Sequence, residues 1–382
     1  MTLFLTVITL LTSILGLWAL LCSALNTFFF HYHDRKARKM DMKDGEKVSV
    51  IIPARNEEEK LPRLLESLTH QEYENYEVLV IDDQSTDSTW EINEKFSRLD
   101  PRIKGYRSDR NVKLSPYGKI NALLQLIPHA TGDILLCTDS DTIHEPDSIS
   151  MGVRFMHERN LSILSGFPRQ LTENYKGGLV TASMVFSNSI LPHFILNPIQ
   201  FIPFSIGIGQ YVMMRRKDYE ETGGYGAMPQ KVCDDIGIIK HFMRNGRRYG
   251  FRNLKEYVSC TMYSDGKSAF SGIERSLTDL FPMNFPVVAG LILAVLSLLT
   301  FAWSPLLLPL FFLSSMTKEA AICISGWLLF HLGWYICARE IGLGRKISAS
   351  AFLTITVICQ MYVHGMYRRI SGKGFEWKGR KV

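Results

Sequence analysis

Two nearly uncharged stretches, residues 1–30 and 284–364, enclose a region whose composition is that of a soluble protein. Residues 2–30 form one apolar run, and a membrane-spanning helix needs about 20 apolar residues. No charged residue precedes this run and no small-residue cleavage site follows it. We therefore expect an uncleaved anchor over residues 1–30 rather than a signal peptide. The basic cluster at residues 35–39 follows the run, which predicts that the next region is cytoplasmic.

The C-terminal apolar stretch is expected to form a transmembrane region over residues 284–364. Its candidate spans are residues 285–313, 320–338 and 347–364. Pro305 and Pro309 interrupt the first of these segments. The tail, residues 365–382, is basic and is also predicted to be cytoplasmic. The crossings should then be even in number, so the first segment is either a hairpin of two short spans or a broken segment that does not cross. These signals together predict a multi-pass protein of the cell (inner) membrane.

The soluble region, residues 44–270, alternates between strand and helix patterns. Runs rich in β-branched residues predict strands at residues 47–54, 76–83 and 133–139. Helical patterns separate them at residues 57–71, 88–99 and 119–128. Such alternation favours parallel pairing and a sheet covered on both faces. We therefore expect an α/β fold, in which ligands bind beyond the carboxyl ends of the strands.

Composition excludes several classes of protein. With 46% hydrophobic and 21% charged residues, the 382-residue chain is too apolar to be disordered. Its seven cysteines include no Cys-x-x-Cys pair, so neither a structural zinc site nor a redox motif is indicated. No nucleic-acid partner is expected.

One segment of the soluble region, residues 178–212, is strongly apolar and contains Pro192, Pro198 and Pro203. Prolines at this spacing break a helix repeatedly. One interpretation is a buried core of loops and strands. The other is an interfacial stretch in the headgroup layer of a membrane.

Acidic residues gather after the predicted strands. Asp82-Asp83 and Asp139-Ser140-Asp141 each end a strand, and Asp234-Asp235 follows an apolar stretch and the pair Gly223-Gly224. Each motif alone has a simple explanation, such as a helix cap or a glycine turn. Carboxylates crowded at one edge of a sheet repel one another unless a cation is present. Magnesium or manganese, held by one or two carboxylates together with substrate phosphates, meets this requirement.

The same motifs resemble glycosyltransferase family 2, the inverting enzymes of GT-A type, over about residues 48–240. The resemblance rests on six strings: VSVIIPARNEE, VLVIDDQSTDST, GKINAL, DILLCTDSD, TGGY and the later Asp-Asp pair. The anchor, Tyr117, Met262-Tyr263 and Glu376-Trp377 are similar to the membrane glucosyltransferases of carotenoid acids such as diaponeurosporenoate. Hopanoid-associated glycosyltransferases and ceramide glucosyltransferase are looser relatives. The resemblance implies a Rossmann-like, mostly parallel sheet.

The resemblance also implies roles for individual residues. Donor binding is carried by Pro53, Ala54, Arg55, Glu57, Asp82, Asp83, Lys119, Asp139 and Ser140. Asp83 corresponds to the acid that reads the uracil ring, and Lys119 to a basic residue near the phosphates. Mn²⁺ or Mg²⁺ is held by Asp139 and Asp141. Asp235, with Asp234 beside it, corresponds to the general base, and the acceptor side includes Gly223, Gly224 and Arg275.

The expected function is transfer of a single sugar from a UDP-sugar, with UDP-glucose as the expected donor, to a lipid acceptor. The Gln-x-x-Arg-Trp string of processive polysaccharide synthases is absent from the chain, which favours single transfer. Thr261 stands where carotenoid-type relatives usually have Arg, so the acceptor stays open. A polyprenyl-phosphate sugar synthase is the alternative enzyme. An inactive binding or assembly subunit is the other alternative. An inactive protein should have lost some of the acidic residues that the family uses, but Asp83, Asp139, Asp141 and Asp235 are all present.

Two further features have ordinary interpretations. His241 lies six residues after Asp235 and is either a third metal ligand or, more commonly for such a histidine, a surface or core residue. Gly207 and Gly209 lack the third glycine of a dinucleotide-binding loop and indicate local packing.

Overall fold

The computed structural model describes residues 1–37, 45–172, 174–229, 233–263, 265–279, 285–374, 376–377 and 380–381. It divides into two compact units. The sheet unit consists of Phe30–Leu171 and Leu196–Met262, and the helical unit of Met1–Phe29, Thr172–Ile195 and Tyr263–Val382. Each unit is described by itself.

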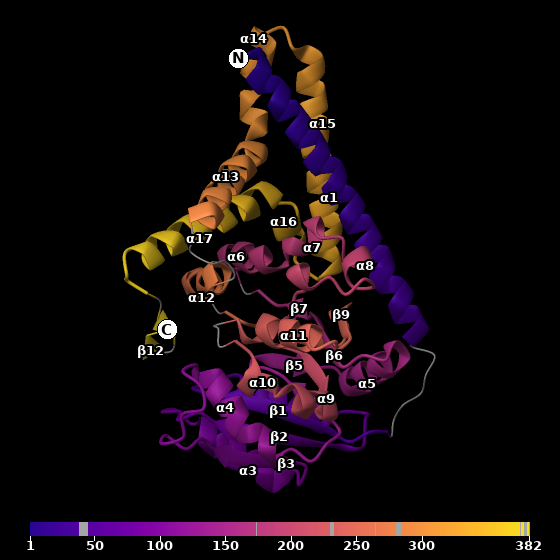
Figure 1. The fold of residues 1–382 in the computed structure, drawn as a ribbon, viewed down its shortest axis with the longest axis vertical. Coiled ribbons are helices and arrows are strands. Elements are labelled where there is room, and N and C mark those ends of the chain that lie inside the picture. The colour runs from indigo at the N-terminus through magenta and orange to yellow at the C-terminus, as the bar shows by residue number, and fades with distance from the viewer. Residues whose placement is uncertain are drawn as a thin grey trace. The chain divides into compact units, whose positions relative to one another are not determined.

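A seven-stranded sheet forms the centre of the sheet unit (Figure 1). Its strands, in spatial order, are β3 (Ile103–Arg107), β2 (Tyr76–Asp82), β1 (Val48–Ala54), β4 (Ile134–Cys137), β8 (Val212–Arg215), β6 (Ile163–Phe167) and β9 (Tyr249–Asn253). The pairs from β3 to β4 are parallel, as is β6 with β9, whereas β8 runs antiparallel to both of its neighbours. The predicted α/β fold with a mostly parallel sheet is confirmed, and the three predicted strands are β1, β2 and β4.

The remaining elements of the sheet unit cover the sheet or carry the loops of the site. The helices are α2 (Leu61–Thr69), α3 (Thr89–Leu99), α4 (Gly118–Leu126), η1 (Ile127–His129), α5 (Ser148–Arg159), η2 (Ile202–Phe204), α9 (Arg216–Thr222), α10 (Gly224–Ala227) and α11 (Asp234–Arg244). A second, three-stranded sheet has the order β5 (Thr142–His144), β10 (Val258–Cys260) and β7 (Arg169–Gln170). The three predicted helices correspond to α2, α3 and α4.

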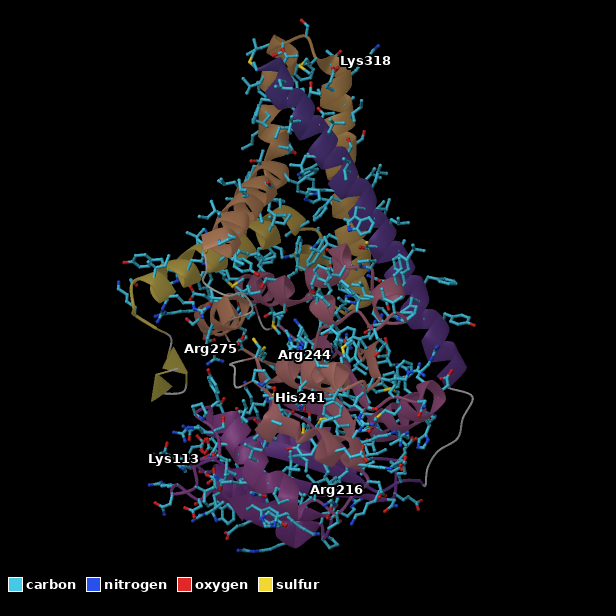
Figure 2. The ribbon with its side chains drawn as sticks, viewed as in Figure 1. Lys113, Arg216, His241, Arg244, Arg275 and Lys318 are labelled. Carbon is cyan, nitrogen blue, oxygen red and sulfur yellow. The ribbon has the colours of Figure 1, made fainter. Side chains whose placement is uncertain are left out.

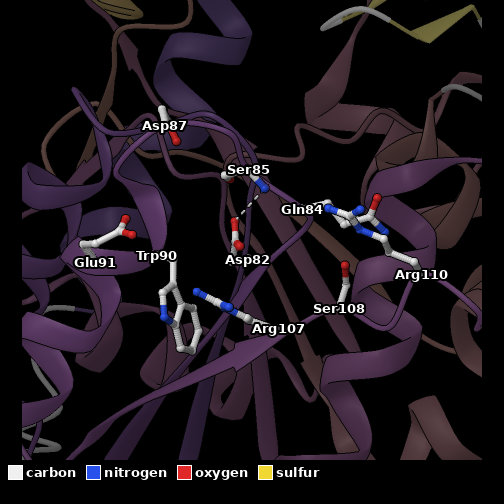
Figure 3. A pocket seen from close by; sticks show the side chains of 9 residues that line it. All are labelled: Asp82, Gln84, Ser85, Asp87, Trp90, Glu91, Arg107, Ser108 and Arg110. Carbon is white, nitrogen blue, oxygen red and sulfur yellow. Dashed lines mark hydrogen bonds between the residues drawn. The ribbon is translucent and has the colours of Figure 1, made fainter.

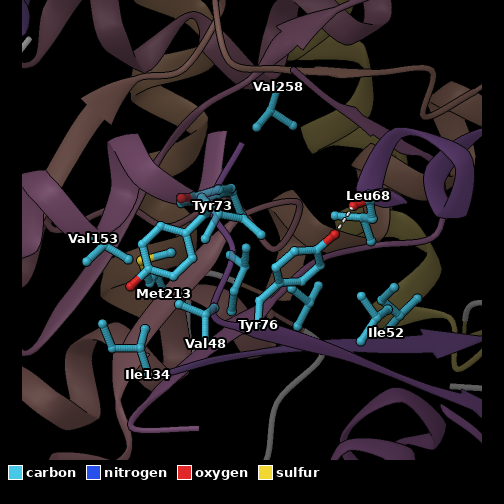
Figure 4. Close-up of a cluster of buried hydrophobic side chains, with 14 of the residues drawn as sticks. Val48, Ile52, Leu68, Tyr73, Tyr76, Ile134, Val153, Met213 and Val258 are labelled. Carbon is cyan, nitrogen blue, oxygen red and sulfur yellow. Dashed lines mark hydrogen bonds between the residues drawn. The ribbon is translucent and has the colours of Figure 1, made fainter. Parts of the chain in front are cut away.

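The core of the sheet unit explains why the β-branched runs form strands. Val50 and Ile52 of β1 and Val78 and Val80 of β2 belong to one cluster of fully buried side chains (Figure 4). The apolar face of α2 packs into the same cluster, and Tyr76 Oη donates a hydrogen bond to the carbonyl at the end of that helix. Burial of one such aliphatic side chain contributes about 1.5–3 kcal/mol. The core therefore fixes the register that brings the carboxyl ends of β1, β2 and β4 to one edge.

The helical unit contains most of the apolar sequence. Its elements are α1 (Thr2–Ala37, which continues into the sheet unit), α6 (Tyr175–Val185), α7 (Ser187–Ile190), α8 (His193–Leu196), α12 (Gly266–Asp279), α13 (Phe285–Ala302), η3 (Ser304–Leu307), α14 (Leu308–Leu313), α15 (Thr317–Glu340), α16 (Arg345–Ser348), α17 (Ala351–Ile370), β11 (Glu376–Trp377) and β12 (Arg380–Lys381). The strands β11 and β12 form an antiparallel pair.

Two of the described helices are long and apolar enough to cross a membrane, namely Thr2–Tyr32 and Thr317–Glu340. A third candidate is the pair Pro286–Ala302 and Ser304–Leu313, bent by 68° at a short break. The bend falls at the predicted prolines, because Pro305 lies at the start of η3 and has no N–H for a continuous helix. The third predicted C-terminal span, residues 347–364, corresponds mainly to α17. This helix is not among the described helices that are long and apolar enough to cross a membrane. The number of crossings stays a prediction.

Close backbone contact joins α1 to α15. A Cβ atom added to Gly16 would lie 2.0 Å from the carbonyl oxygen of Gly326, and one added to Gly333 would lie 2.8 Å from the backbone of α1. Only glycine permits this approach, which is the usual packing of helices in membranes. The predicted anchor is therefore an integral part of the helical unit.

The predicted apolar segment, residues 178–212, does not form one body. Residues up to Ile195 cluster with the helical unit, and Leu196 onward with the sheet unit. Its last residue, Val212, begins the buried strand β8 of the main sheet. Both interpretations of residues 178–212 stay predictions.

Candidate active site

Two loops at the carboxyl edge of the sheet are fastened to each other. Arg55, after β1, donates from Nη1 to the carbonyl oxygens of Asp83 and Gln84 at 2.6 and 3.3 Å. Asn56, which has a positive φ of 51°, accepts at Oδ1 from the backbone N–H of Thr86. The backbone N–H of Glu57 donates to Thr89 Oγ1 at 2.8 Å. The predicted nucleotide loop is therefore held in a fixed shape by the loop that follows β2.

Both acids at the end of β2 are buried, but they have different hydrogen-bond partners. Asp83 is buried; its N–H donates to the carbonyl of Ala54, and its carboxylate accepts from Ser108 Oγ at 3.2 Å. Asp82 Oδ1 accepts from the N–H of Ser85 and lines a hollow of about 260 Å³ (Figure 3). The other residues that line this hollow are Gln84, Ser85, Asp87, Trp90, Glu91, Arg107, Ser108 and Arg110. The Arg107 guanidinium lies 4.2 Å from the centre of the Trp90 ring, a cation–π contact.

Lys119 connects the acids at the end of β4 to those at the start of α11. Its Nζ lies 2.8 Å from Asp139 Oδ1 and 3.2 Å from Asp234 Oδ2. Burial alone would lower the pKa of Lys119, but Asp139 and Asp234 outweigh it and hold that pKa well above its usual range. The lysine is therefore charged, and it brings two of the predicted acidic motifs to one place.

Gly209 lies at the centre of this cluster. Its N–H donates to Asp235 Oδ2 at 2.9 Å. A Cβ atom added to it would lie 2.9 Å from Lys119 Nζ and 3.6 Å from carboxylate oxygens of both Asp139 and Asp235. The interpretation of this glycine as local packing was incomplete: a side chain there would occupy space that the charged groups share. Gly207 does have a packing role, because a Cβ there would meet the backbone of α11.

The second acid of the Asp-x-Asp motif lies on the other side of Asp139. Asp141 Oδ1 accepts a weak hydrogen bond from Cys260 Sγ at 3.4 Å, and burial followed by repulsion from Asp139 raises the pKa of Asp141. Burial followed by repulsion from Asp234 likewise raises the pKa of Asp235. The intervening Ser140 is buried. Like charges are thus held together at this edge, and Lys119 at Asp139 and Asp234 and Lys60 at Asp141 only partly offset them.

Asp139 and Asp141 are the residues that could hold a divalent cation. Carboxylate oxygens suit Mg²⁺ and Mn²⁺, and the repulsion that Asp139 exerts on Asp141 is what a bound cation would relieve. Among the described residues, no group of three or more His, Cys, Asp and Glu side chains is placed to hold a metal. Two carboxylates suit a cation that also takes oxygen ligands from substrate phosphates.

Other predicted residues lie elsewhere. Gly223, with a φ of 76°, ends α9, and a Cβ added to Gly224 would lie 2.2 Å from the Tyr219 ring, so both glycines are required by the local turn. His241 pairs through Nε2 with the carbonyl of Thr222 at 2.9 Å, which gives it a packing role on α11. Arg275 lies on α12 in the helical unit. His241 and Arg275 are labelled in Figure 2. Acceptor roles for the glycines and Arg275 stay predictions.

Three features of the site were not predicted from the sequence: Gly209, Cys260 and the Trp90–Arg107 pair. Gly209 had a signal, since a Gly-x-Gly pair precedes a strand, but its partners come from distant segments. Cys260 had no such signal, because it is one of seven cysteines that form no Cys-x-x-Cys pair. The Trp90–Arg107 pair depends on the register of α3 and β3, and β3 has no strong apolar pattern.

Comparison with known proteins agrees with this geometry. Residues 49–223 match the sequence model described as glycosyl transferase family 2. The putative glycosyltransferase EpsE of Bacillus subtilis (strain 168) is 28% identical over 219 residues, which cover 56% of this chain and 72% of that protein. A dolichol-phosphate mannosyltransferase of Pyrococcus furiosus is 36% identical over 104 residues, 27% of this chain, and the match spans only 28% of its own length.

A solved structure shows the same fold. The mannosyltransferase PcManGT from Pyrobaculum calidifontis, determined in complex with GDP-Man and Mn²⁺, aligns with a TM-score of 0.50 and 17% sequence identity. The alignment covers 97% of this chain and 99% of that one. The family model, the relatives and the fold agree with the loops and acids assembled at the sheet edge: residues 49–223 match glycosyl transferase family 2, and the chain is a glycosyltransferase.

Proposed function

We propose that this enzyme transfers a single sugar from a nucleotide-sugar donor, a UDP-sugar, to a lipid acceptor at a membrane surface. The observation that carries the proposal is the assembly of Asp139, Lys119, Asp234 and Asp235 around Gly209 at the carboxyl edge of the sheet. The fastened loops after β1 and β2 provide a rigid site for the nucleotide on the same edge, and Asp83 is the residue proposed to read the base. UDP-glucose is the first donor to test.

The proposed reaction assigns a task to each group. Asp235 accepts the proton of an acceptor hydroxyl, which attacks the anomeric carbon from the face opposite the leaving diphosphate. General base catalysis of this kind is worth typically about 10²–10⁴-fold. Lys119 offsets charge that develops on the diphosphate. A divalent cation held by Asp139 and Asp141 would add Lewis-acid stabilisation of that charge.

The lipid acceptor is supported by the apolar surface of the protein. Thr2–Tyr32 and Thr317–Glu340 are apolar enough to cross a membrane. In the sheet unit, Ile199, Phe201 and Phe204 are exposed, and the two aromatic rings contact each other at 5.6 Å. This apolar tip, residues 199–204, contains Pro203 and directly follows Pro198. These prolines prevent a span, and we propose that the tip lies at headgroup depth.

A polyprenyl-phosphate acceptor is the second candidate. Relatives of the chain include the Pyrococcus mannosyltransferase and an undecaprenyl-phosphate 4-deoxy-4-formamido-L-arabinose transferase, the latter 36% identical over 107 residues. A phosphate acceptor is already ionised, so no proton has to be removed. Replacing Asp235 with Asn would then cost much less than it does with a hydroxyl acceptor.

A donor panel tests the proposal. Purified full-length protein is given Mn²⁺ or Mg²⁺ and labelled UDP-glucose, UDP-GlcNAc or GDP-mannose, together with a bacterial total lipid extract, and the labelled lipids are resolved by chromatography. We expect one UDP-sugar to label one lipid, and we expect Asp141→Ala or excess chelator to abolish the signal. Label in water-soluble products alone, or full activity in excess chelator, would contradict the proposed acceptor or the proposed metal respectively.

Topology is a separate part of the proposal. The basic clusters predict that reporters fused at residue 45 and at residue 382 both report the cytoplasm. An external C-terminus would require an odd number of C-terminal crossings and would contradict a pair of spans in residues 285–316.

A further inference from the structure

The N-terminal helix makes polar contacts with a broken segment, residues 187–194, inside the helical unit. This segment consists of α7 and the start of α8, separated at Leu191-Pro192. Figure 1 shows both short helices beside α1. Helices of one turn are not stable by themselves, so the segment depends on partners outside it.

Asn26 supplies partners on both sides of the break. Its Nδ2 donates to the carbonyl oxygens of Asn188 at 3.0 Å and Leu191 at 2.8 Å. Its Oδ1 accepts from the backbone N–H of Phe194 at 3.1 Å. Asn26 is 1% exposed, so these bonds form in a buried environment where unsatisfied backbone groups are costly.

The hydrogen bonds of Asn26 replace those that the proline removes. In a continuous helix the carbonyl of residue 188 would accept from the N–H of residue 192, but Pro192 has none. The N–H of Phe194 would in turn pair with the carbonyl of Ile190. That carbonyl instead accepts from Trp18 Nε1 at 2.8 Å and from Cys22 Sγ at 3.6 Å. Side chains of α1 therefore complete a backbone pattern that the segment cannot complete itself, as irregular backbone at membrane depth requires.

The opposite side of the segment is held by α15. Asn188 Nδ2 donates to Cys337 Sγ at 3.5 Å. The ring of Phe186 packs on the rings of Phe330 and Trp334, with centroids 6.1 and 5.7 Å apart. The segment thus contacts both α1 and α15, and each of these helices is long and apolar enough to cross a membrane.

We propose that Asn26 is a positioning residue for acceptor binding, because it fixes residues 187–194, so that the N-terminal helix is more than a tether. The inference rests on the proposed lipid acceptor. Residues 187–194 lead directly into the exposed apolar tip of residues 199–204, and in the sequence both lie between Asp139-Asp141 and Asp234-Asp235. The donor-binding residues all lie in the other unit, so loss of Asn26 should separate acceptor binding from donor chemistry.

The test uses full-length protein in detergent with a bacterial total lipid extract as acceptor and a labelled UDP-sugar. Asn26→Leu removes the three hydrogen bonds while keeping the size of the side chain. We expect its apparent KM for lipid to rise at least about tenfold, the factor that corresponds to about 1.4 kcal/mol. Its KM for donor and its slow hydrolysis of donor without lipid should be unchanged.

The matched control is Thr12→Val. Thr12 is also fully buried on α1, but its hydroxyl bonds only to carbonyls of its own helix, those of Ile8 and Thr9. We expect no change in its KM for lipid. If Asn26→Leu does not accumulate as folded protein, Trp18→Phe removes one hydrogen bond from a residue that is 43% exposed and should raise the KM for lipid to a smaller extent.

Several outcomes would overturn the inference. Equal loss of lipid transfer and donor hydrolysis in Asn26→Leu would make Asn26 a general structural residue. An unchanged KM for lipid in both Asn26→Leu and Trp18→Phe would show that the segment does not affect the acceptor. A wild-type enzyme that hydrolyses donor but labels no lipid would instead contradict the proposed function, and that result is recognised before any variant is made.

Discussion

Replacing Glu77 with Gln should destabilise the sheet unit while leaving the active site intact. Glu77 is near the start of β2, at the opposite end of the strand from Asp82, and it is 3% exposed. Its Oε1 accepts from Ser49 Oγ and from the N–H and hydroxyl of Thr131, and its Oε2 pairs with Lys104 Nζ at 2.8 Å. A glutamine would present an amide group to the lysine in place of an oxygen.

The size of the effect follows from the pKa of this carboxyl group. Burial raises that pKa, but the hydrogen bonds from Lys104, Thr131 and Ser49 outweigh burial and lower it from 4.5 to about 2. A shift of one unit corresponds to 1.36 kcal/mol, so the ionised form contributes about 3 kcal/mol to folding. In a unit of roughly 200 residues, each kcal/mol shifts Tm by about 2–4 °C, which predicts a fall of about 6–12 °C at pH 7.

The pH dependence gives the sign of the effect. A carboxyl group with a lowered pKa in the folded state stabilises above its unfolded pKa, here about 4.5. That contribution is lost as the pH falls through the folded pKa of about 2. The difference in Tm between wild type and Glu77→Gln should therefore be largest at neutral pH and shrink steadily below about pH 4.5.

Scanning calorimetry of the protein in detergent measures this difference. Glu94→Gln is the control, because Glu94 forms an exposed pair with Arg98 on α3, and such pairs contribute less than about 1 kcal/mol. A Tm difference below about 2 °C at pH 7, or one that does not change with acid, would refute the electrostatic reasoning. The KM for donor should not change in Glu77→Gln.

Three further predictions concern the site. Burial and Asp234 raise the pKa of Asp235, so the rate of transfer to a hydroxyl acceptor should increase with pH through the neutral range. Asp235→Asn should lower kcat by about 10²–10⁴-fold and remove that pH dependence. Profiles of rate against pH for both proteins measure this. Gly209→Ala should lower transfer at least about tenfold with little change in Tm, because its Cβ would lie 2.9 Å from Lys119 Nζ; wild-type kcat in this variant would contradict the crowding argument. Phe201→Glu with Phe204→Glu should reduce transfer to lipid but spare donor hydrolysis, and equal loss of both would assign these rings to the fold.

The sequence predicted the half of the sheet that carries the donor motifs. Residues 48–54 and 76–82 are continuous β-branched runs, so local propensity and burial favour the same structure. Parallel pairing then requires the residues that follow these two strands to meet at one edge, and the hydrogen bonds from Arg55 to the carbonyls of Asp83 and Gln84 show that they do. The predicted roles of these residues in catalysis remain to be tested.

The other half of the sheet could not be predicted in the same way. The strand β8 is a four-residue segment that runs antiparallel to its neighbours, and it begins at Val212, the last residue of the apolar run 178–212. Its neighbour β6 follows α5 and contains Ser165 and Gly166, which weaken the strand pattern. Tertiary pairing overrides weak local preference here, and the same pairing determines where Gly209 lies.

The contacts of Asn26 show which type of polar residue in an apolar run predicts a contact with a distant part of the chain. Thr12 and Ser13 bond to carbonyls of their own helix, three or four residues back, so a hydroxyl in a spanning helix needs no outside partner. Asn26, in contrast, carries donors and an acceptor that bond to residues more than 160 positions away. An asparagine in the apolar run therefore indicates a buried polar partner elsewhere in the chain. A proline-broken segment, here around Pro192, is where such a partner should be sought, because it has backbone groups that its own helices leave unpaired.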